Sequence, residues 1–134
     1  RERWQAMTDE ELIGEAMAAR ALSYSPYSKF PVGAALRSSS GKVFGGSNIE
    51  NASYGLTICA ERVAMGMAVA AGERSFDAIA VVVKGGGSPC GACRQVLHEF
   101  APDLRILIAD ENGKLVQETS LRDLLPGAFG PDSL

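Results

Sequence analysis

The sequence predicts an α/β fold in which helices are layered on a mixed β-sheet. Three observations support this class. Strand-like and helix-like segments alternate along the 134 residues, five short apolar segments have the composition of strands, and glycine- or serine-rich breaks separate them. The chain shows no internal repeat and is too short for two full domains. We therefore expect one domain over residues 1–134.

The first elements are a helix and a β-hairpin. Thr8 and Glu11 have the spacing of a capping box, and apolar residues on one face extend the predicted helix to about Ser23. The loop 25–28 follows. Strands are then predicted over 32–36 and 42–46, joined by a serine-rich turn at 38–41.

In the second half of the chain, predicted helices and strands alternate more strictly. A helix is predicted from about Cys59 to Gly72, because glycine suits the position just past a helix end. Another helix should begin near Gly91. The other predicted elements, in order, are a strand at 77–84, a glycine break at 85–87, a strand at 104–109, a turn at 111–113, a strand at 114–117 and a short helix at 121–125.

Composition restricts the function classes. The net charge of −3 and the isoelectric point near 5.1 argue against a nucleic-acid protein with a basic face, so a small or neutral ligand fits better. The strongly apolar run 63–71 is too short to cross a bilayer, and the segment 1–4 has no apolar signal. An odd number of cysteines prevents complete internal pairing, which favours free thiols in the cytoplasm.

The segment 63–71 contains no polar residue. A helix that is apolar on every side is expected to be buried all round. In a chain of this size a second subunit is the expected cover, and the alternative is one central helix in a monomer.

All three cysteines fall in one pattern, Cys59-Ala60-Glu61 followed by Pro89-Cys90-Gly91-Ala92-Cys93. Three thiolates suit a tetrahedral zinc ion whose fourth position is open to water, which is typical of a catalytic site. Glu61 is placed to transfer the protons of that water. The pattern predicts a zinc hydrolase.

Spacing constrains how these residues meet. Because residues i and i+2 do not share a helix face, Cys59 and Glu61 converge only if Cys59 precedes the first helical turn. Cys90 and Cys93 share a face, so two helix N-termini would point at the metal and favour thiolates. Three thiolates also oppose deprotonation of the water. Arg62 or Arg94 would offset their charge, and we favour Arg62, with a solvated surface arginine as the alternative.

Two simpler interpretations remain for the cysteines. A closed structural zinc site needs a fourth ligand, but His98 lies five residues past Cys93 and is rotated away, as expected of a solvent-facing helix position. A Cys90–Cys93 redox pair would leave Cys59 and Glu61 without a role.

The sequence resembles the small, homotetrameric, zinc-dependent cytidine deaminases. In this enzyme class a glutamate that is not a zinc ligand acts as general acid and base toward the zinc-bound water. The resemblance covers nearly the whole chain and implies a three-layer α/β/α fold with a mixed five-stranded sheet. It rests on the segments 30–36, 48–52, 59–62, 89–96 and 124–131.

The resemblance implies a role for each matching position. Cys59, Cys90 and Cys93 match the ligands of one Zn²⁺ per subunit, and Glu61 matches the proton shuttle. The implied substrate contacts are Asn48 and Glu50 at the ribose hydroxyls, Phe30 against the pyrimidine, the Ala60 backbone at the base, Tyr54 beside them, and Phe129 in the site of a neighbouring subunit.

Each substrate contact has a simpler alternative. Asn48 and Glu50 are also suited to fixing a loop, Phe30 to the core, and Phe129 to covering the terminal helix. The segment 54–57 departs from the family, in which many members have proline after the tyrosine, so the shape of this loop is open.

The resemblance implies hydrolytic deamination of cytidine and deoxycytidine to uridine and deoxyuridine, with release of ammonia. One alternative is the same fold acting on another aminopyrimidine nucleoside such as blasticidin S. Others are a non-catalytic zinc-stabilised oligomeric module and a polynucleotide editor, which the charge and the lack of a basic, aromatic channel disfavour. We expect a cytoplasmic homotetramer with sites at subunit interfaces, binding neither nucleic acid nor membrane.

Overall fold

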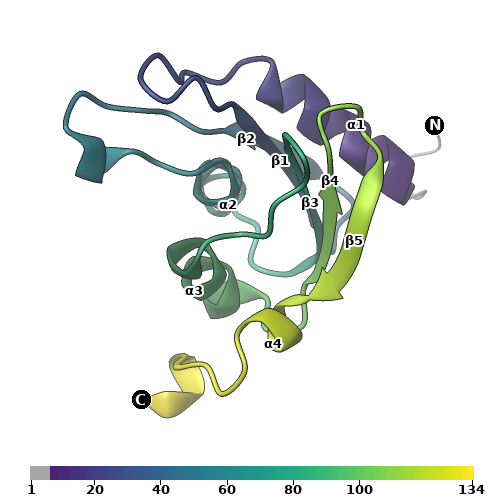
Figure 1. Ribbon diagram of the computed structural model, residues 1–134. Coiled ribbons are helices and arrows are strands. Elements are labelled where there is room, and N and C mark those ends of the chain that lie inside the picture. The colour runs from purple at the N-terminus through teal and green to yellow at the C-terminus, as the bar shows by residue number, and fades with distance from the viewer. Residues whose placement is uncertain (1–6) are drawn as a thin grey trace.

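The structure is a computed structural model that describes residues 7–134, so the segment 1–4 considered above lies outside it. Its centre is a five-stranded sheet in the order β2-β1-β3-β4-β5 (Figure 1). β3 and β4 run parallel, and every other neighbouring pair is antiparallel, which confirms the mixed sheet. The strands are β1 Val32–Ser38, β2 Val43–Ser47, β3 Phe76–Val83, β4 Arg105–Ala109 and β5 Leu115–Ser120.

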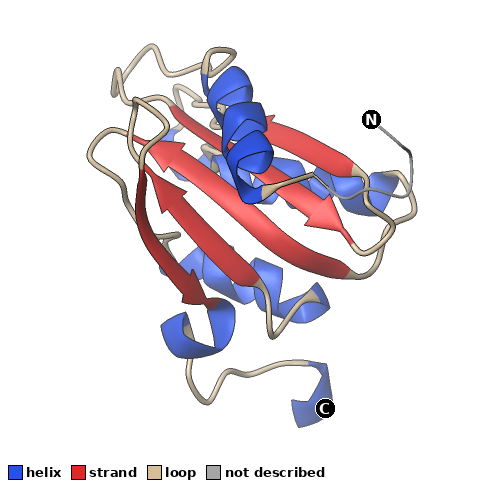
Figure 2. Ribbon diagram, turned by 90° about the vertical axis from the view of Figure 1, so that its right-hand side faces the viewer, coloured by secondary structure: helices blue, strands red, loops and turns tan. Residues whose placement is uncertain are grey.

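Helices cover both faces of the sheet, which confirms the three-layer arrangement (Figures 1 and 2). α1 (Asp9–Arg20) lies on one face, while α2 (Ala60–Ala70) and α3 (Gly91–Phe100) lie on the other. α4 (Leu121–Leu124) directly follows β5, and two short 3₁₀ helices cover Tyr54–Leu56 and Pro131–Ser133. Within residues 7–134, no helix has the length and apolar character needed to cross a membrane.

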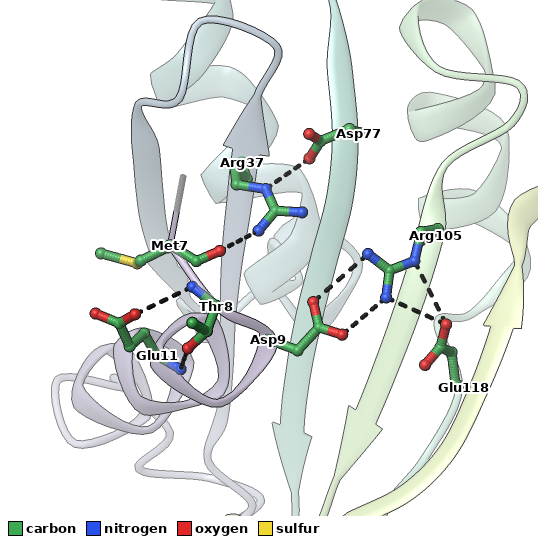
Figure 3. Close-up of polar contacts among 8 residues, drawn as sticks. All are labelled: Met7, Thr8, Asp9, Glu11, Arg37, Asp77, Arg105 and Glu118. Carbon is green, nitrogen blue, oxygen red and sulfur yellow. Dashed lines mark hydrogen bonds and ion pairs between the residues drawn. The ribbon is translucent and has the colours of Figure 1, made fainter. Parts of the chain in front are cut away.

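The predicted capping box begins α1. Glu11 N–H donates to the Thr8 hydroxyl at 3.2 Å, and the Glu11 carboxylate accepts from Thr8 N–H at 3.1 Å. Ion pairs tie this end to the sheet: Arg105 bonds Asp9 at 2.8 Å and Glu118 at 3.2 Å (Figure 3). The helix ends at Arg20 rather than at Ser23, because the 80% exposed Leu22 no longer adds to the buried face.

A second basic side chain joins β1 to its surroundings. Arg37 pairs with Asp77 at 2.7 Å and donates to the Met7 carbonyl (Figure 3). These contacts lie at the end of β1 and β3 opposite to the loops that carry the cysteines. They contribute to the fold and not to the site.

A close approach at Gly46 fixes the start of α2 against β2. A Cβ atom at Gly46 would lie 2.6 Å from the Ala60 carbonyl oxygen and 2.5 Å from the Ala64 nitrogen. Only glycine leaves room for this contact. The first turn of α2, which carries Glu61, is thereby seated directly on the sheet.

α2 begins and ends where the sequence predicts, but its surroundings differ. Gly72 has φ +95°, and the bonds Gly72 N–H to Val69 O and Glu73 N–H to Ala68 O form a Schellman motif. Met67 is 56% exposed, and Gly66 and Ala70 are exposed as well. Among residues 7–134 no layer lies beyond α2, so the alternative of one central helix buried in a monomer is wrong, and cover by a second subunit stays a prediction.

β5 continues to Ser120, three residues past the predicted end. Its polar last residues pair in register with β4, Arg105 facing Ser120 and Ile106 facing Thr119. Pairing with a buried neighbour, which the sequence pattern does not reveal, extends the strand.

Candidate metal centre and active site

The cysteines lie at the starts of the two helices on one face of the sheet. Cys59 is the N-cap of α2, with φ −71° and ψ 153°, and Cys90 is the N-cap of α3, with φ −66° and ψ 169°. Cys93 lies three residues further in α3 and is buried. Cys59 therefore has the non-helical backbone that its convergence with Glu61 requires.

The three sulfur atoms form a compact cluster. All lie within 4.8 Å of one another, and the Sγ atoms of Cys90 and Cys93 are 3.4 Å apart. Sulfurs at about 2.3 Å from a tetrahedral zinc would lie about 3.8 Å apart, so the cluster fits this ion after small side-chain movements. Among residues 7–134 the cluster contains no fourth histidine, cysteine or carboxylate ligand.

His98 does not belong to this cluster. It lies half-buried under the C-terminal segment, where a Cβ atom at Gly130 would be 2.7 Å from His98 Nε2. The expectation of a solvent-facing position is wrong, because residues 126–134 fold back over this side of α3.

The thiols differ in their acidity before a metal binds. Burial would raise the pKa of Cys90, but N–H groups of Cys93 and Ala92 and the neighbouring thiols outweigh it and lower the pKa. Burial, and next the Glu61 carboxylate, raise the pKa of Cys93. A bound dication would therefore be needed to deprotonate Cys93.

Arg62 lies against the sulfur cluster. Its Nη2 donates to Cys59 Sγ at 3.4 Å, and the bonds to Cys59 and then Cys93 raise the pKa of the guanidinium. Arg62 Nε is buried and has no hydrogen-bond partner among the described residues. Its positive charge therefore faces the thiolates that it was predicted to balance.

Arg94 lies elsewhere. It donates to the Pro89 carbonyl at 2.7 Å, to the Leu124 carbonyl at 2.8 Å and to the Ser88 hydroxyl at 2.9 Å. These bonds fix the loop before Cys90 to α4, which gives Arg94 a structural position.

Glu61 is a carboxyl group with little access to solvent. It lies in the first turn of α2, and 5% of its surface is exposed. Burial raises the pKa of Glu61 above its ordinary value, although its own N–H and the Arg62 charge act in the opposite direction. A carboxyl group with a raised pKa is suited to accept and return protons near neutral pH.

This raised pKa predicts a pH-dependent stability difference. The folded state favours the protonated acid, so the stability it contributes is complete below the ordinary pKa and is lost as pH rises through the raised one. Metal-free Glu61→Gln should therefore unfold several degrees above the parent at about pH 7.5 and at the same temperature at about pH 4. Thermal unfolding with a chelator and a reductant measures this, and a variant less stable at both pH values would contradict it.

A pocket of about 270 Å³ opens beside Cys59 and Glu61. Its walls are mainly apolar, with Phe30 and two valines of β3 facing polar groups of α2 and of the preceding loop. The lining residues are Phe30, Val32, Asn48, Thr57, Cys59, Ala60, Glu61, Val81, Val83, Lys84, Gly86, Gly87 and Ser88. The structure thus brings Phe30, Asn48 and Ala60 together with Glu61.

Asn48 is largely committed to the protein backbone. Its Oδ1 accepts from Val32 N–H at 2.9 Å and from the Ser23 hydroxyl, and its Nδ2 donates to the Phe30 carbonyl at 2.9 Å. An amide oxygen has two lone pairs, so Oδ1 has no capacity left. The contact of Asn48 with a ribose hydroxyl stays a prediction, and in this chain one Nδ2 hydrogen remains available as a donor for it.

Glu50 and Tyr54 line an adjoining hollow of about 240 Å³ that shares Thr57 with the pocket. The Glu50 carboxylate accepts from the Ser28 hydroxyl and from the N–H groups of Tyr27 and Ser28, and the Ser28 bond is the main cause that lowers its pKa. Tyr54 is exposed and contacts Tyr27, with ring centroids 5.7 Å apart.

Phe129 does not reach the pocket of its own chain. It is 62% exposed on the C-terminal segment, where its carbonyl accepts from Gln95 Nε2 at 2.8 Å.

Sequence reasoning also missed residues that shape the site. Tyr27 and Ser28 hold Tyr54 and Glu50, and Thr57, Gly86 and Gly87 line the pocket. The exposed aromatic in the 25–28 loop, just before Phe30, was an available signal for the first two; the pocket lining depends on how β3 and α2 pack.

The comparisons with known proteins agree with this geometry. The sequence model of the cytidine and deoxycytidylate deaminase zinc-binding region matches residues 6–109. The chain is 49% identical over 131 residues to a cytidine deaminase of Sporosarcina psychrophila, covering 96% of each chain. It is 36% identical over 128 residues to a blasticidin-S deaminase of Bacillus cereus, covering 88% of this chain and 89% of the relative.

A solved structure extends the similarity to the fold. The crystal structure of cytidine deaminase from Burkholderia pseudomallei superposes with a TM-score of 0.88 and 53% identity, covering 92% of this chain and 100% of that one. The fold and the three-cysteine centre thus define a zinc-binding deaminase. The chain belongs to the cytidine and deoxycytidylate deaminase family.

Proposed function

We propose that this protein is a zinc-dependent enzyme that converts cytidine and deoxycytidine to uridine and deoxyuridine and releases ammonia. The observation that carries the proposal is the buried Glu61, which lines the same pocket as Cys59 at the edge of the three-sulfur cluster. The 49% and 53% identities to cytidine deaminases support this substrate over blasticidin S, for which the identity is 36%.

Cys59, Cys90 and Cys93 would hold one zinc ion. When bound, zinc supplies Lewis acidity that lowers the pKa of a coordinated water from about 15.7 to roughly 7–9. Arg62, at 3.4 Å from Cys59 Sγ, withdraws negative charge from the thiolates and so counters their opposing effect.

Glu61 carries the protons. As the oxygen of water bonds to C4 of the pyrimidine, Glu61 takes the proton from that water and delivers it to N3. It then takes the remaining proton from the new C4 hydroxyl and transfers it to the amino group, so that the C4–N4 bond breaks, ammonia leaves and a C4 carbonyl remains. The raised pKa of Glu61 suits both directions of transfer at neutral pH.

The pocket walls would orient the nucleoside. Phe30 packs against the pyrimidine and the Ala60 backbone meets its polar edge, both beside Glu61. Asn48 offers its remaining Nδ2 hydrogen to a sugar hydroxyl. Glu50, whose pKa is lowered chiefly by Ser28, accepts from a sugar hydroxyl in the adjoining hollow, which Tyr54 borders.

Conversion of cytidine by the zinc-loaded protein tests the proposal. Uridine and ammonia should form in equal amounts, with deoxycytidine also converted and blasticidin S and free cytosine converted much less. A protein that binds one zinc ion and converts none of the four would be a binding module, and the proposal would fail.

We further propose that the catalytic domain, residues 1–134, acts as a homotetramer in the cytoplasm. The uncovered apolar face of α2 around Met67 and the exposed Phe129 support assembly with other copies, in which Phe129 enters a neighbour's site. Three free thiols needed as ligands suit a reducing compartment.

The α2 face predicts a specific assembly defect. Met67→Glu would place a charge in an apolar contact, so it should convert tetramers to smaller species and reduce turnover, whereas Glu10→Gln on the exposed surface of α1 should do neither. Sedimentation equilibrium measures the mass of each. A fully assembled Met67→Glu variant would exclude this face as the interface.

A further inference from the structure

We propose that Glu111, which lies on the β4–β5 turn outside the pocket, is a positioning residue that holds one wall of the pocket in place for the substrate. Gly86 and Gly87 line the pocket, and Gly85 directly precedes them; we call these three residues, between β3 and the loop that leads to Cys90, the glycine wall. The inference rests on the proposed function, because it concerns how this wall meets the nucleoside.

The backbone of the glycine wall has one turn bond of its own among the described residues, from Gly86 N–H to the Val83 carbonyl at 2.9 Å. Gly85 and Gly86 have φ values of +75° and +73°, in the left-handed region that favours glycine. Three successive glycines have no side chains to pack and lose more conformational freedom on ordering than other residues do. A contact from outside the wall would therefore add to this single turn bond in keeping the wall in one position.

The fold supplies that contact from the β4–β5 turn. Because β3 and β4 are parallel, the connections that follow them leave the sheet at the same edge (Figure 1). Glu111 Oε2 accepts a hydrogen bond from Gly85 N–H at 3.0 Å, across 26 residues of sequence. On the outer side, a Cβ atom at Gly86 would lie 3.0 Å from Val116 Cγ2, so β5 supports the wall from behind.

The rest of the loop is fixed by other groups. Arg94 holds Ser88 and Pro89, and with them the approach to Cys90. Loss of the Glu111 contact would therefore release the glycine wall and leave the metal ligands in place. Gly87 lines the pocket, and its N–H has no acceptor among residues 7–134, which leaves a backbone donor at this wall for the substrate.

A mobile wall must be ordered each time a substrate binds, and this ordering costs binding free energy. The cost should raise KM and leave kcat nearly unchanged. Glu111→Ala should raise KM for cytidine about three- to tenfold, as expected for one lost hydrogen bond, with kcat within about twofold of the parent. Glu111→Gln keeps a carbonyl oxygen as acceptor and should restore KM. Asn112→Ala, an exposed side chain on the same turn, is the matched control and should leave KM unchanged.

Amide hydrogen exchange of residues 84–88 provides a second measurement that does not depend on activity. Exchange should be faster in Glu111→Ala than in the parent, Glu111→Gln or Asn112→Ala, with zinc content equal in all four. Unchanged exchange, or a KM for Glu111→Ala equal to that of the parent, would overturn the inference, as would kcat and zinc falling together. If the parent does not deaminate cytidine, the proposed function fails, while the exchange rates still decide whether Glu111 holds the wall.

Discussion

Replacement of Glu61 by alanine or glutamine is expected to lower kcat for cytidine by about 10²–10⁴-fold, the usual contribution of a positioned general acid–base group. Among the described residues that line the pocket, no other carboxyl group is present to take the proton of the water and return it to N3. Glutamine preserves the size of the side chain, so a loss of turnover in Glu61→Gln reports the loss of the carboxyl group and not a loss of packing.

The comparison needs zinc content and fold to be equal. Metal analysis should find one zinc ion per chain in the parent and in both Glu61 variants, because the proposed ligands are the three cysteines and not Glu61. Glu10→Gln, which removes an exposed carboxylate of α1, is the control and should retain parental turnover. Turnover by Glu61→Ala within about tenfold of the parent would refute the role given to this residue.

Replacement of Cys93 by serine is expected to abolish zinc binding and turnover together. Cys93 is the buried member of the cluster, and a neutral hydroxyl is a far poorer zinc ligand than a thiolate. Because a metal held by two helix starts stabilises the folded state, the variant should also unfold roughly 5–15 °C below the zinc-loaded parent.

Chelation gives the matching measurement. A strong chelator should lower the unfolding temperature of the parent to near that of Cys93→Ser and leave the variant unchanged. Glu10→Gln, on the exposed surface of α1, is the control and should bind zinc like the parent. Full zinc content in Cys93→Ser would show that the metal is held elsewhere.

Much of the fold could be predicted because local signals and tertiary structure agree. The capping box at Thr8, the glycine end of α2 at Gly72 and the valine-rich β3 each specify their element through neighbours in sequence. The ends of α1 and β5 could not be predicted, since Leu22 turns away from the core and the polar residues up to Ser120 are extended by pairing with β4.

The candidate site likewise has features that local sequence predicts and features that depend on distant segments. The start of α2 at Ala60 makes Cys59 its N-cap, a local consequence of sequence that the spacing of Cys59 and Glu61 required. The partners of Asn48 and the support of the glycine wall by Glu111 join segments far apart in the chain, so no local pattern revealed them. Nor did the pattern reveal that His98 lies under Gly130.

X-ray absorption at the zinc edge of the loaded protein tests the three-sulfur centre. The expected ligands are three sulfur atoms at about 2.3 Å and one oxygen at about 2.0 Å, and a molecule bound in the pocket should displace that oxygen. A fourth protein ligand, whether an imidazole or a further sulfur from another chain, or fewer than three sulfurs, would contradict this expectation.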